Sequence, residues 1–172
     1  MKKLLLAVIV SLSTVTTAAL AEIKVGIILG FTGPIESLTP AMRDGARMAF
    51  DEASNSGNLL GGESITILEA DSTCVDSAAA TAAAEDLVAQ GVTAIMGADC
   101  SGVTGAINAN VAVPNGILMV SPSATSPGLS KVPDNGTFWR TAPSDAKGGQ
   151  VLAKLALSRG IESIAVTYTN ND

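Results

Sequence analysis

The residues with the clearest chemical potential lie in one short segment, Gly97-Ala98-Asp99-Cys100-Ser101-Gly102, between two apolar runs. A cysteine on a sharp turn between a strand and a helix can act as a nucleophile if a neighbouring base removes its proton. The sequence contains no histidine, which excludes Cys-His and Ser-His pairs and histidine zinc sites. A carboxylate directly beside Cys100 also disfavours the reactive thiolate. The segment therefore predicts no enzyme, and no carboxylate pair elsewhere suggests hydrolysis or a metal site.

Cys100 has a second use, because the sequence contains one other cysteine, Cys74. The two cysteines lie 100 − 74 = 26 residues apart. An even number of cysteines in an exported chain suggests a disulfide. Closing a loop of this size would stabilise the fold by about 3 kcal/mol in the chain-entropy model.

Ser101 follows the cysteine at the position where a helix would have its N-cap. The backbone N–H groups of Gly102, Val103 and Thr104 would then be the first ones free to bind an anion. The sequence has no G-x-x-x-x-G-K phosphate loop, so a single carboxylate is the better match. The alternative is that Ser101 only caps its helix.

A second group of hydroxyl residues lies in the segment Ser-Pro-Ser-Ala-Thr-Ser-Pro at 121–127. Ser123, Ala124 and Thr125 sit here between two prolines. Their hydroxyl, N–H and carbonyl groups could hold both the carboxylate and the ammonium of a small zwitterion. The alternative is a structured turn in which the hydroxyls bond only to the nearby backbone.

Apolar or β-branched segments typical of buried strands alternate with segments typical of helices. We expect strands at residues 23–29, 64–70, 93–97 and 117–121, and helices from Thr39 as N-cap with Pro40 as first residue to the turn at 55–57, from Asp76 or Ser77 to Gln90, and from Ser101 to about Val113. This order predicts an α/β fold with a doubly wound parallel sheet. Such sheets bind ligands at the carboxyl ends of their strands, where both hydroxyl groups fall.

The pattern changes after residue 120. A loop without periodicity at 121–135 is followed by a short extended piece at 137–141, a helix capped by Ser144, and a further strand at 163–169. A lone helix and strand cannot bury both of their faces. We therefore expect one complete domain at 22–142 and the start of a second at 143–172, in a chain that is a fragment. The alternative is a compact five-stranded domain of flavodoxin type.

The N-terminus has the features of a signal peptide at residues 1–21. Lys2 and Lys3 precede an apolar stretch, and Ala19-Leu20-Ala21 is a cleavage site, so the mature chain is expected to begin at Glu22. Loss of the two lysines changes the net charge from −6 to −8. An acidic chain of this kind is a poor ligand for nucleic acid or an anionic membrane surface.

Several of these segments together resemble one known family. In order, "IKVGIILGFTGP", "AMRDGARMAFDEAS", "AIMGADCSG", "GILMVSPSATSP" and "FWRTAPSD" are similar to segments of periplasmic solute-binding proteins of ABC importers. The closest subgroup is the branched-chain amino acid (leucine, isoleucine and valine) binding proteins. The resemblance covers the whole mature chain and implies a type I periplasmic-binding fold of two α/β lobes that close on a ligand without catalysis.

The resemblance also implies roles for individual residues. Ser101 and the loop of Ser123, Ala124 and Thr125 would clamp the α-carboxylate and α-ammonium of an amino acid, with Thr104 near Ser101. Cys74 and Cys100 would form the family's disulfide. The expected protein is a periplasmic monomer without a cofactor, and its partner is an ABC permease in the inner membrane. The alternative function is a ligand-sensing ectodomain of a receptor, or an amide-responsive regulator, with the same fold.

Overall fold

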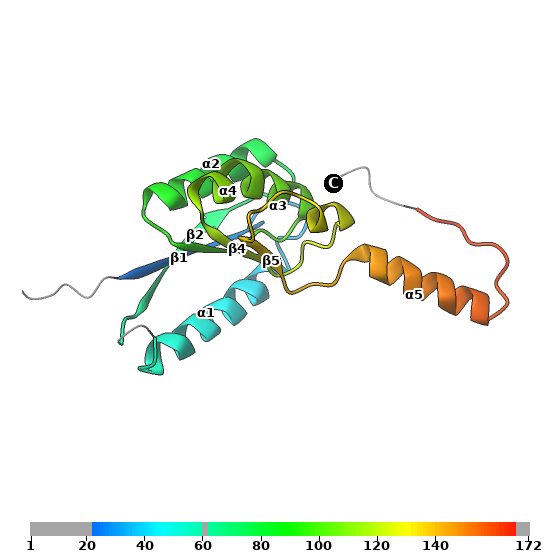
Figure 1. Ribbon diagram of the computed structural model, residues 1–172, viewed down its shortest axis with the longest axis horizontal. Coiled ribbons are helices and arrows are strands. Elements are labelled where there is room, and N and C mark those ends of the chain that lie inside the picture. Colours follow the sequence, from blue (N-terminus) through cyan, green and yellow to red (C-terminus); the bar gives the residue numbers. More distant parts are fainter. Residues whose placement is uncertain (1–21, 60–61, 168–172) are drawn as a thin grey trace, which may run out of the picture.

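The computed structural model describes residues 22–59 and 62–167, and its centre is a five-stranded parallel sheet (Figure 1). The strands are β1 (Ile23–Leu29), β2 (Ile65–Asp71), β3 (Ala94–Gly97), β4 (Leu118–Ser121) and β5 (Phe138–Arg140). Their order in the sheet is β2-β1-β3-β4-β5, with every neighbouring pair parallel. The predicted doubly wound α/β sheet is confirmed. The predicted signal peptide at 1–21 lies outside the described residues.

Helices cover the two faces of this sheet unequally (Figure 1). The helices are α1 (Thr39–Asn55), α2 (Ser77–Ala89), α3 (Ser101–Ile107), the π-helix η1 (Asn108–Ala112), α4 (Val113–Asn115), the 3₁₀ helix η2 (Pro127–Ser130) and α5 (Asp145–Ser158). The run from α3 to α4 lies beside α2 on one face, and α1 packs against β1 and β2 on the other. None of these helices, within the described ranges, has the length and hydrophobicity needed to cross a membrane.

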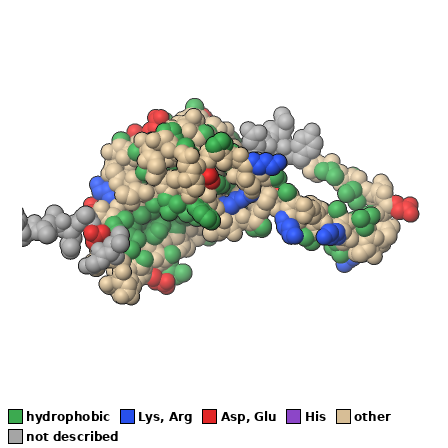
Figure 2. All heavy atoms as spheres, in the orientation of Figure 1, with side chains coloured by type: hydrophobic (Ala, Val, Ile, Leu, Met, Phe, Trp, Pro, Cys, Tyr) green, Lys and Arg blue, Asp and Glu red, His purple; other side chains and the backbone are tan. Residues whose placement is uncertain are grey.

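The hydrophobic core lies between the sheet and the layer formed by α2 and α3. Ile28, Leu87, Ile95, Ile107 and Met119 are almost completely buried there. Side chains alternate along a strand, so the neighbours of these core residues face the side of the sheet that carries α1. On that side Leu118 and Trp139 remain exposed, and hydrophobic side chains gather next to α1 (Figure 2).

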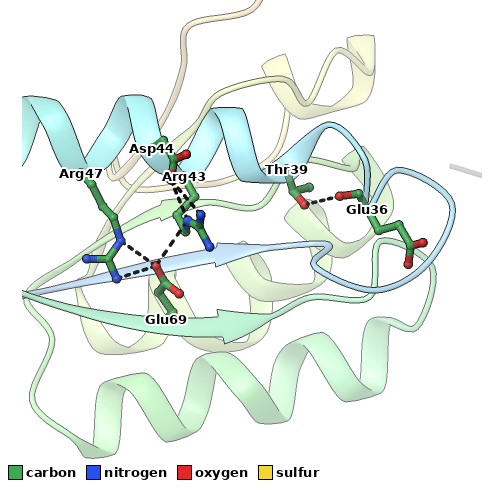
Figure 3. A network of polar contacts seen from close by, with 6 residues as sticks. All are labelled: Glu36, Thr39, Arg43, Asp44, Arg47 and Glu69. Atoms are coloured by element: carbon green, nitrogen blue, oxygen red, sulfur yellow. Dashed lines mark hydrogen bonds and ion pairs between the residues drawn. The ribbon is translucent and has the colours of Figure 1, made fainter.

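The start of α1 differs from the prediction. Thr39 is its first residue rather than its N-cap, and the N-cap position is taken by Leu38 without a side-chain hydrogen bond. The Thr39 hydroxyl, which is fully buried, instead shares its proton between the carbonyls of Gly30 and Glu36, both at 3.2 Å. Figure 3 draws the contact with Glu36. The Thr39 hydroxyl therefore connects α1 to the end of β1 and does not cap the helix.

Polar contacts also join the middle of α1 to the sheet (Figure 3). Arg47 forms an ion pair with Glu69 of β2 at 2.6 Å, and Arg43 approaches the same carboxylate at 3.9 Å while pairing with Asp44 at 2.8 Å. All four side chains are partly exposed. Ion pairs of this kind contribute about 1 kcal/mol or less, so they orient α1 more than they stabilise it.

The other predicted helices agree better. Asp76 caps α2 by accepting hydrogen bonds from Ala78 N and Ala79 N, and Ser144 caps α5 by accepting one from Ala146 N. The third helix begins at residue 101 and continues through the π-turn and α4 to residue 115. The extended piece expected at 137–141 forms the edge strand β5.

The strand predicted at 163–169 is wrong for its described part. Residues 161–167 have no regular secondary structure and their side chains are exposed. The reason is physical, because a strand needs a neighbour for its backbone hydrogen bonds and the described residues offer none beside this segment. The preceding α5 has no buried residue and extends away from the sheet (Figure 1). The domain division at residue 142 remains a prediction.

We predict that Gly97→Ala destabilises the fold strongly. Gly97 has a φ of +136°, and a Cβ there would lie 2.0 Å from the carbonyl oxygen of Ile28. Strain and overlap together should lower the free energy of unfolding by at least about 3 kcal/mol in urea denaturation. Gly45→Ala is the matched control, because Gly45 is inside α1 with open space around its Cβ position. That change should stabilise by about 0.5–1 kcal/mol, and equal effects of the two changes would contradict the account.

Candidate ligand-binding site

The buried carboxylate of Asp99 lies at the centre of the strand ends. Its Oδ2 accepts a hydrogen bond from Gly30 N at 2.8 Å, and its Oδ1 accepts from Ser72 Oγ at 3.2 Å and from Cys100 N at 3.0 Å. The residue is 3% exposed, and no ion pair to it occurs among the described residues. A buried carboxylate is tolerated where several donors satisfy it. Asp99 thus joins the ends of β1, β2 and β3.

The disulfide between Cys74 and Cys100 lies directly beside this carboxylate. The two Sγ atoms are 2.03 Å apart and the two Cα atoms 5.2 Å apart, so the predicted pairing is confirmed. The bond joins the loop after β2 to the first turn after β3. Cys100 is therefore occupied, and the nucleophile that the turn first suggested is not present.

A cleft of about 480 Å³ opens above these groups at the carboxyl ends of the strands. It is lined by Pro34, Ile35, Cys74, Val75, Ser77, Asp99, Cys100, Ser101, Gly102, Val103, Ser123 and Thr125. Three of the predicted ligand residues, Ser101, Ser123 and Thr125, are therefore brought together in one cleft. The rest of the lining is mostly apolar, apart from Ser77 and Asp99, and contains no arginine or lysine.

Two other predicted ligand residues do not reach this cleft. Thr104 and Ala124 are both fully buried and are absent from its lining. Thr104 lies on the inner side of α3, where its N–H and its hydroxyl both donate to the carbonyl of Cys100, at 2.9 and 2.8 Å. The expectation that Thr104 offers a free N–H is therefore wrong. Ala124 is buried beneath the cleft-lining residues, and its N–H donates to Ser121 Oγ, which holds the loop against the end of β4.

Ser101 is not the N-cap either. Cys100 occupies that position without a side-chain cap, and Ser101 is the first residue of α3. Its Oγ accepts a hydrogen bond from the backbone N–H of Ser126 at 3.1 Å. The hydroxyl therefore links α3 to the loop after β4 instead of capping its own helix.

The three hydroxyls in the cleft differ in what they can offer a ligand. Ser123 Oγ donates its proton to the carbonyl of Asp99, and Thr125 Oγ1 donates its proton to the carboxylate of Asp145. A hydroxyl has one proton, so these two present only lone pairs to the cleft. Ser101 Oγ accepts from an amide, and its own proton has no acceptor within residues 22–59 and 62–167, so it can donate to a ligand. The cleft therefore has an acceptor side and a donor side.

Arg140 fixes the loop that carries the acceptor side. Its Nη1 donates to the carbonyls of Ala124 at 3.1 Å and Ser126 at 2.8 Å, and its Nη2 donates to Ser130 Oγ at 2.5 Å. Our sequence reasoning missed this residue. The available signal was an arginine at the end of a short strand that is otherwise apolar. This strand follows a long loop whose backbone carbonyls can accept hydrogen bonds from it.

Asp71, the last residue of β2, also holds two loops together, although it does not line the cleft itself. Partial burial acts to raise the pKa of its carboxyl, but hydrogen bonds from the Thr32 hydroxyl and from the backbone N–H groups of Thr73, Thr32 and Phe31 hold the pKa below its ordinary value. The bond from Thr32 Oγ1 measures 2.6 Å and the bond from Thr73 N 2.8 Å. The charged form of Asp71 therefore joins the loop after β1 to the loop after β2.

A parallel α/β sheet with a hydroxyl-lined cleft at its strand ends, and with no lysine or arginine in that cleft, is typical of proteins that bind a small molecule. Within that class, the chain belongs to the periplasmic binding protein family, whose sequence profile matches residues 22–172. This confirms the resemblance found in the sequence. The family consists of substrate-binding proteins.

Individual relatives agree with this assignment. The Leu/Ile/Val-binding protein BraC3 of Rhizobium johnstonii is 32% identical over 155 residues, which are 90% of this chain and 41% of the relative. The leucine-specific-binding protein of Salmonella typhimurium has the same identity and coverage. The chain thus spans about two fifths of the length of the curated relatives it matches.

Two solved structures of similar proteins contain a branched-chain amino acid. The branched-chain amino acid transporter substrate-binding protein LivJ of Streptococcus pneumoniae, in complex with isoleucine, is 31% identical with a TM-score of 0.64, over 72% of this chain and 34% of that one. An ABC transporter substrate-binding protein of Desulfitobacterium hafniense, in complex with Leu, is 27% identical with a TM-score of 0.70, over 87% of this chain and 43% of that one.

We predict that Asp99→Ala destabilises the lobe more than any exposed acidic change. The substitution leaves the buried Gly30 N–H, the Ser72 hydroxyl and the Cys100 N–H without their acceptor. The free energy of unfolding should fall by at least about 3 kcal/mol. Asp86→Ala, on the exposed side of α2, is the control and should change it by about 0.5 kcal/mol or less. Similar midpoints for both variants in urea would refute the role of Asp99.

We predict a pH-dependent effect for Asp71→Asn. Because the folded state lowers the pKa of Asp71, its carboxylate stabilises the protein above the unfolded-state pKa of about 4, and this stabilisation is lost as the pH falls through the folded value. The variant should be less stable than the wild type at pH 7, and the difference should shrink below pH about 4. Urea denaturation at several pH values measures this. A difference that stays constant down to pH 3 would argue against it.

Proposed function

We propose that this chain is the ligand-capturing part of an extracytoplasmic substrate-binding protein, which takes up a small amino acid for an ABC transporter. The observation that carries the proposal is the polarity of the cleft. Ser101 offers a proton, whereas Ser123 and Thr125 offer lone pairs. A zwitterion supplies the complement, since its carboxylate accepts and its ammonium donates.

The carboxylate of the ligand would then bind on the side of Ser101, and the ammonium between Ser123 and Thr125. The apolar wall formed by Pro34, Ile35 and the Cys74–Cys100 disulfide fits an uncharged aliphatic group. The names of the relatives support a leucine-like ligand, because they describe Leu/Ile/Val-binding and leucine-specific-binding proteins.

The location and the partner follow from the same proposal. Export through a signal peptide cleaved after Ala21 would place the protein in the periplasm, where a disulfide persists. There it would act as a monomer that delivers its ligand to a permease in the inner membrane. Its role would be binding without catalysis, because the cysteine in the cleft is held in a disulfide.

Binding of amino acids to the mature protein is the direct test. We expect isothermal titration to detect L-leucine or a related aliphatic amino acid within a panel of amino acids, amides and small carboxylates. Ser101→Ala should weaken that binding about tenfold or more, because the ligand carboxylate loses a charge-assisted hydrogen bond. Ser158→Ala removes a hydroxyl near the end of α5, far from the cleft, and should leave the affinity unchanged.

Thermal unfolding of each variant would show that the protein is folded during the titration. No binding across the whole panel would reject the proposed function. Unchanged affinity in Ser101→Ala would reject the placement of the carboxylate.

A further inference from the structure

The disulfide between Cys74 and Cys100 forms part of the wall of the cleft. Both cysteines line the cleft and both are partly exposed. Val75, directly after Cys74, also lines the cleft and is 63% exposed. A ligand in the cleft would therefore lie against the disulfide or its immediate neighbours. When the cleft is empty, the same opening gives a small thiol access to the bond.

The backbone at the Cys74 end of the disulfide has an unfavourable conformation. Thr73 and Cys74 have φ angles of +56° and +69°, in the left-handed region. Residues with a Cβ rarely adopt this region, because the Cβ crowds the neighbouring backbone. Two such residues in a row persist only where the surrounding structure holds them in place.

Few other bonds hold this turn. Thr73 N donates to Asp71 Oδ1 at 2.8 Å, and Thr73 Oγ1 accepts from Asp76 N at 3.1 Å, so both bonds stay within the turn itself. Within residues 22–59 and 62–167, the backbone groups of Cys74 and Val75 form no hydrogen bond. The disulfide is therefore the bond that joins this pair of residues to the segment after β3.

The loop after β1 packs against the same turn. A Cβ on Gly33 would lie 2.5 Å from the carbonyl oxygen of Thr73, so the two loops are in close contact. The residues that follow Gly33, Pro34 and Ile35, are apolar and line the cleft. A shift of the turn at 73–75 would therefore also change the position of this apolar part of the lining.

We propose that ligand binding in this cleft is linked to the redox state of Cys74 and Cys100, so that the disulfide form binds tightly and the dithiol form binds weakly. This inference rests on the proposed function and deepens it, because it concerns the regulation of the same site. Once the covalent bond is broken, the two sulfurs become non-bonded neighbours and must move apart. The left-handed turn then loses its restraint, and the apolar lining loses the shape that fits an aliphatic group.

The reductant that this step requires is an external dithiol. One of its thiolates attacks a sulfur of the disulfide, the S–S bond breaks, and the other cysteine leaves as a thiolate and takes up a proton. The second thiol of the reagent then attacks the mixed disulfide and releases the remaining cysteine. Two electrons and two protons pass to the protein, and the reagent leaves as its own disulfide.

The linkage acts in both directions. If reduction lowers the affinity for the ligand by some factor, a saturating ligand must lower the equilibrium constant for reduction by the same factor. The occupied protein therefore keeps its disulfide at a dithiol concentration that reduces the empty protein. A purely structural disulfide distant from the ligand would show no such effect.

The first test measures the affinity of the mature protein for L-leucine, or for the aliphatic amino acid that it binds best. Isothermal titration compares the oxidised protein with protein reduced by dithiothreitol in the absence of oxygen, with the free thiols counted by labelling. We expect reduction to lower the affinity about tenfold or more. The double variant Cys74→Ala with Cys100→Ala should bind as weakly as the reduced protein and should not respond to dithiothreitol.

The second test measures the reverse direction. The protein is equilibrated with mixtures of reduced and oxidised dithiothreitol, with and without saturating ligand, and the free thiols are labelled. The ligand should lower the equilibrium constant for reduction by the same factor that the titration gives.

A control variant separates this effect from a general loss of stability. Val92 is 3% exposed and lies two residues before β3, at the end of the sheet opposite the cleft. Val92→Ala should lower the midpoint of thermal unfolding, because it leaves a cavity in the core. It should leave the affinity of the oxidised protein unchanged. A loss of affinity in Val92→Ala as large as that caused by reduction would overturn the proposal.

The remaining outcomes separate this inference from the function on which it rests. Equal affinities of the oxidised and reduced proteins, or a ligand that does not change the extent of reduction, overturn the linkage while the proposed function stands. If thermal unfolding shows that neither the reduced protein nor the double alanine variant folds, the disulfide serves the fold as a whole, which also overturns it. An oxidised protein that binds no member of the amino-acid panel overturns both.

Discussion

The carboxylate of Asp99 holds three strand ends together, and the geometry of the cleft depends on it. Gly30, Ser72 and Cys100 each donate a hydrogen bond to it; Gly30 and Ser72 begin the loops after β1 and β2, and Cys100 directly precedes α3. A buried charge without a cationic partner requires several donors at fixed positions. That requirement sets the separation of the loops more narrowly than the packing of apolar side chains would. The disulfide beside it adds a covalent limit between two of the same loops.

Much of the fold could be predicted from the sequence, because buried parallel strands are apolar and β-branched and helices begin at recognisable caps. β1 is such a run, and Asp76 caps α2 as expected. Two of the predictions that failed concern side chains that could either cap a helix or bond to a distant segment. Thr39 and Ser101 are both residue types that favour the N-cap position. Their hydroxyls instead form hydrogen bonds with backbone groups 9 and 25 residues away. The strand expected at 163–169 failed because pairing depends on a neighbour that local sequence does not describe.

The candidate site, too, could be predicted only in part from the sequence. The sequence located the loops, since ligands of α/β sheets bind where strands end. It did not distinguish the hydroxyls that reach the cleft from the side chains beneath them, because burial of Thr104 and Ala124 depends on how α3 packs. Nor did it reveal which hydroxyls have already used their proton. That property comes from the partners of Ser123 and Thr125, which lie 24 residues before and 20 residues after them in the chain. Arg140 was missed for the same reason.

The central claim is that the hydroxyl polarity of the cleft sets the orientation of a zwitterionic ligand. A crystal structure of the mature protein with bound L-leucine tests this most directly. The account predicts the leucine nitrogen within about 3 Å of Thr125 Oγ1, and a carboxylate oxygen at the same distance from Ser101 Oγ. Leucine bound in the reverse orientation, or bound away from the cleft between Ser101 and Thr125, would contradict it.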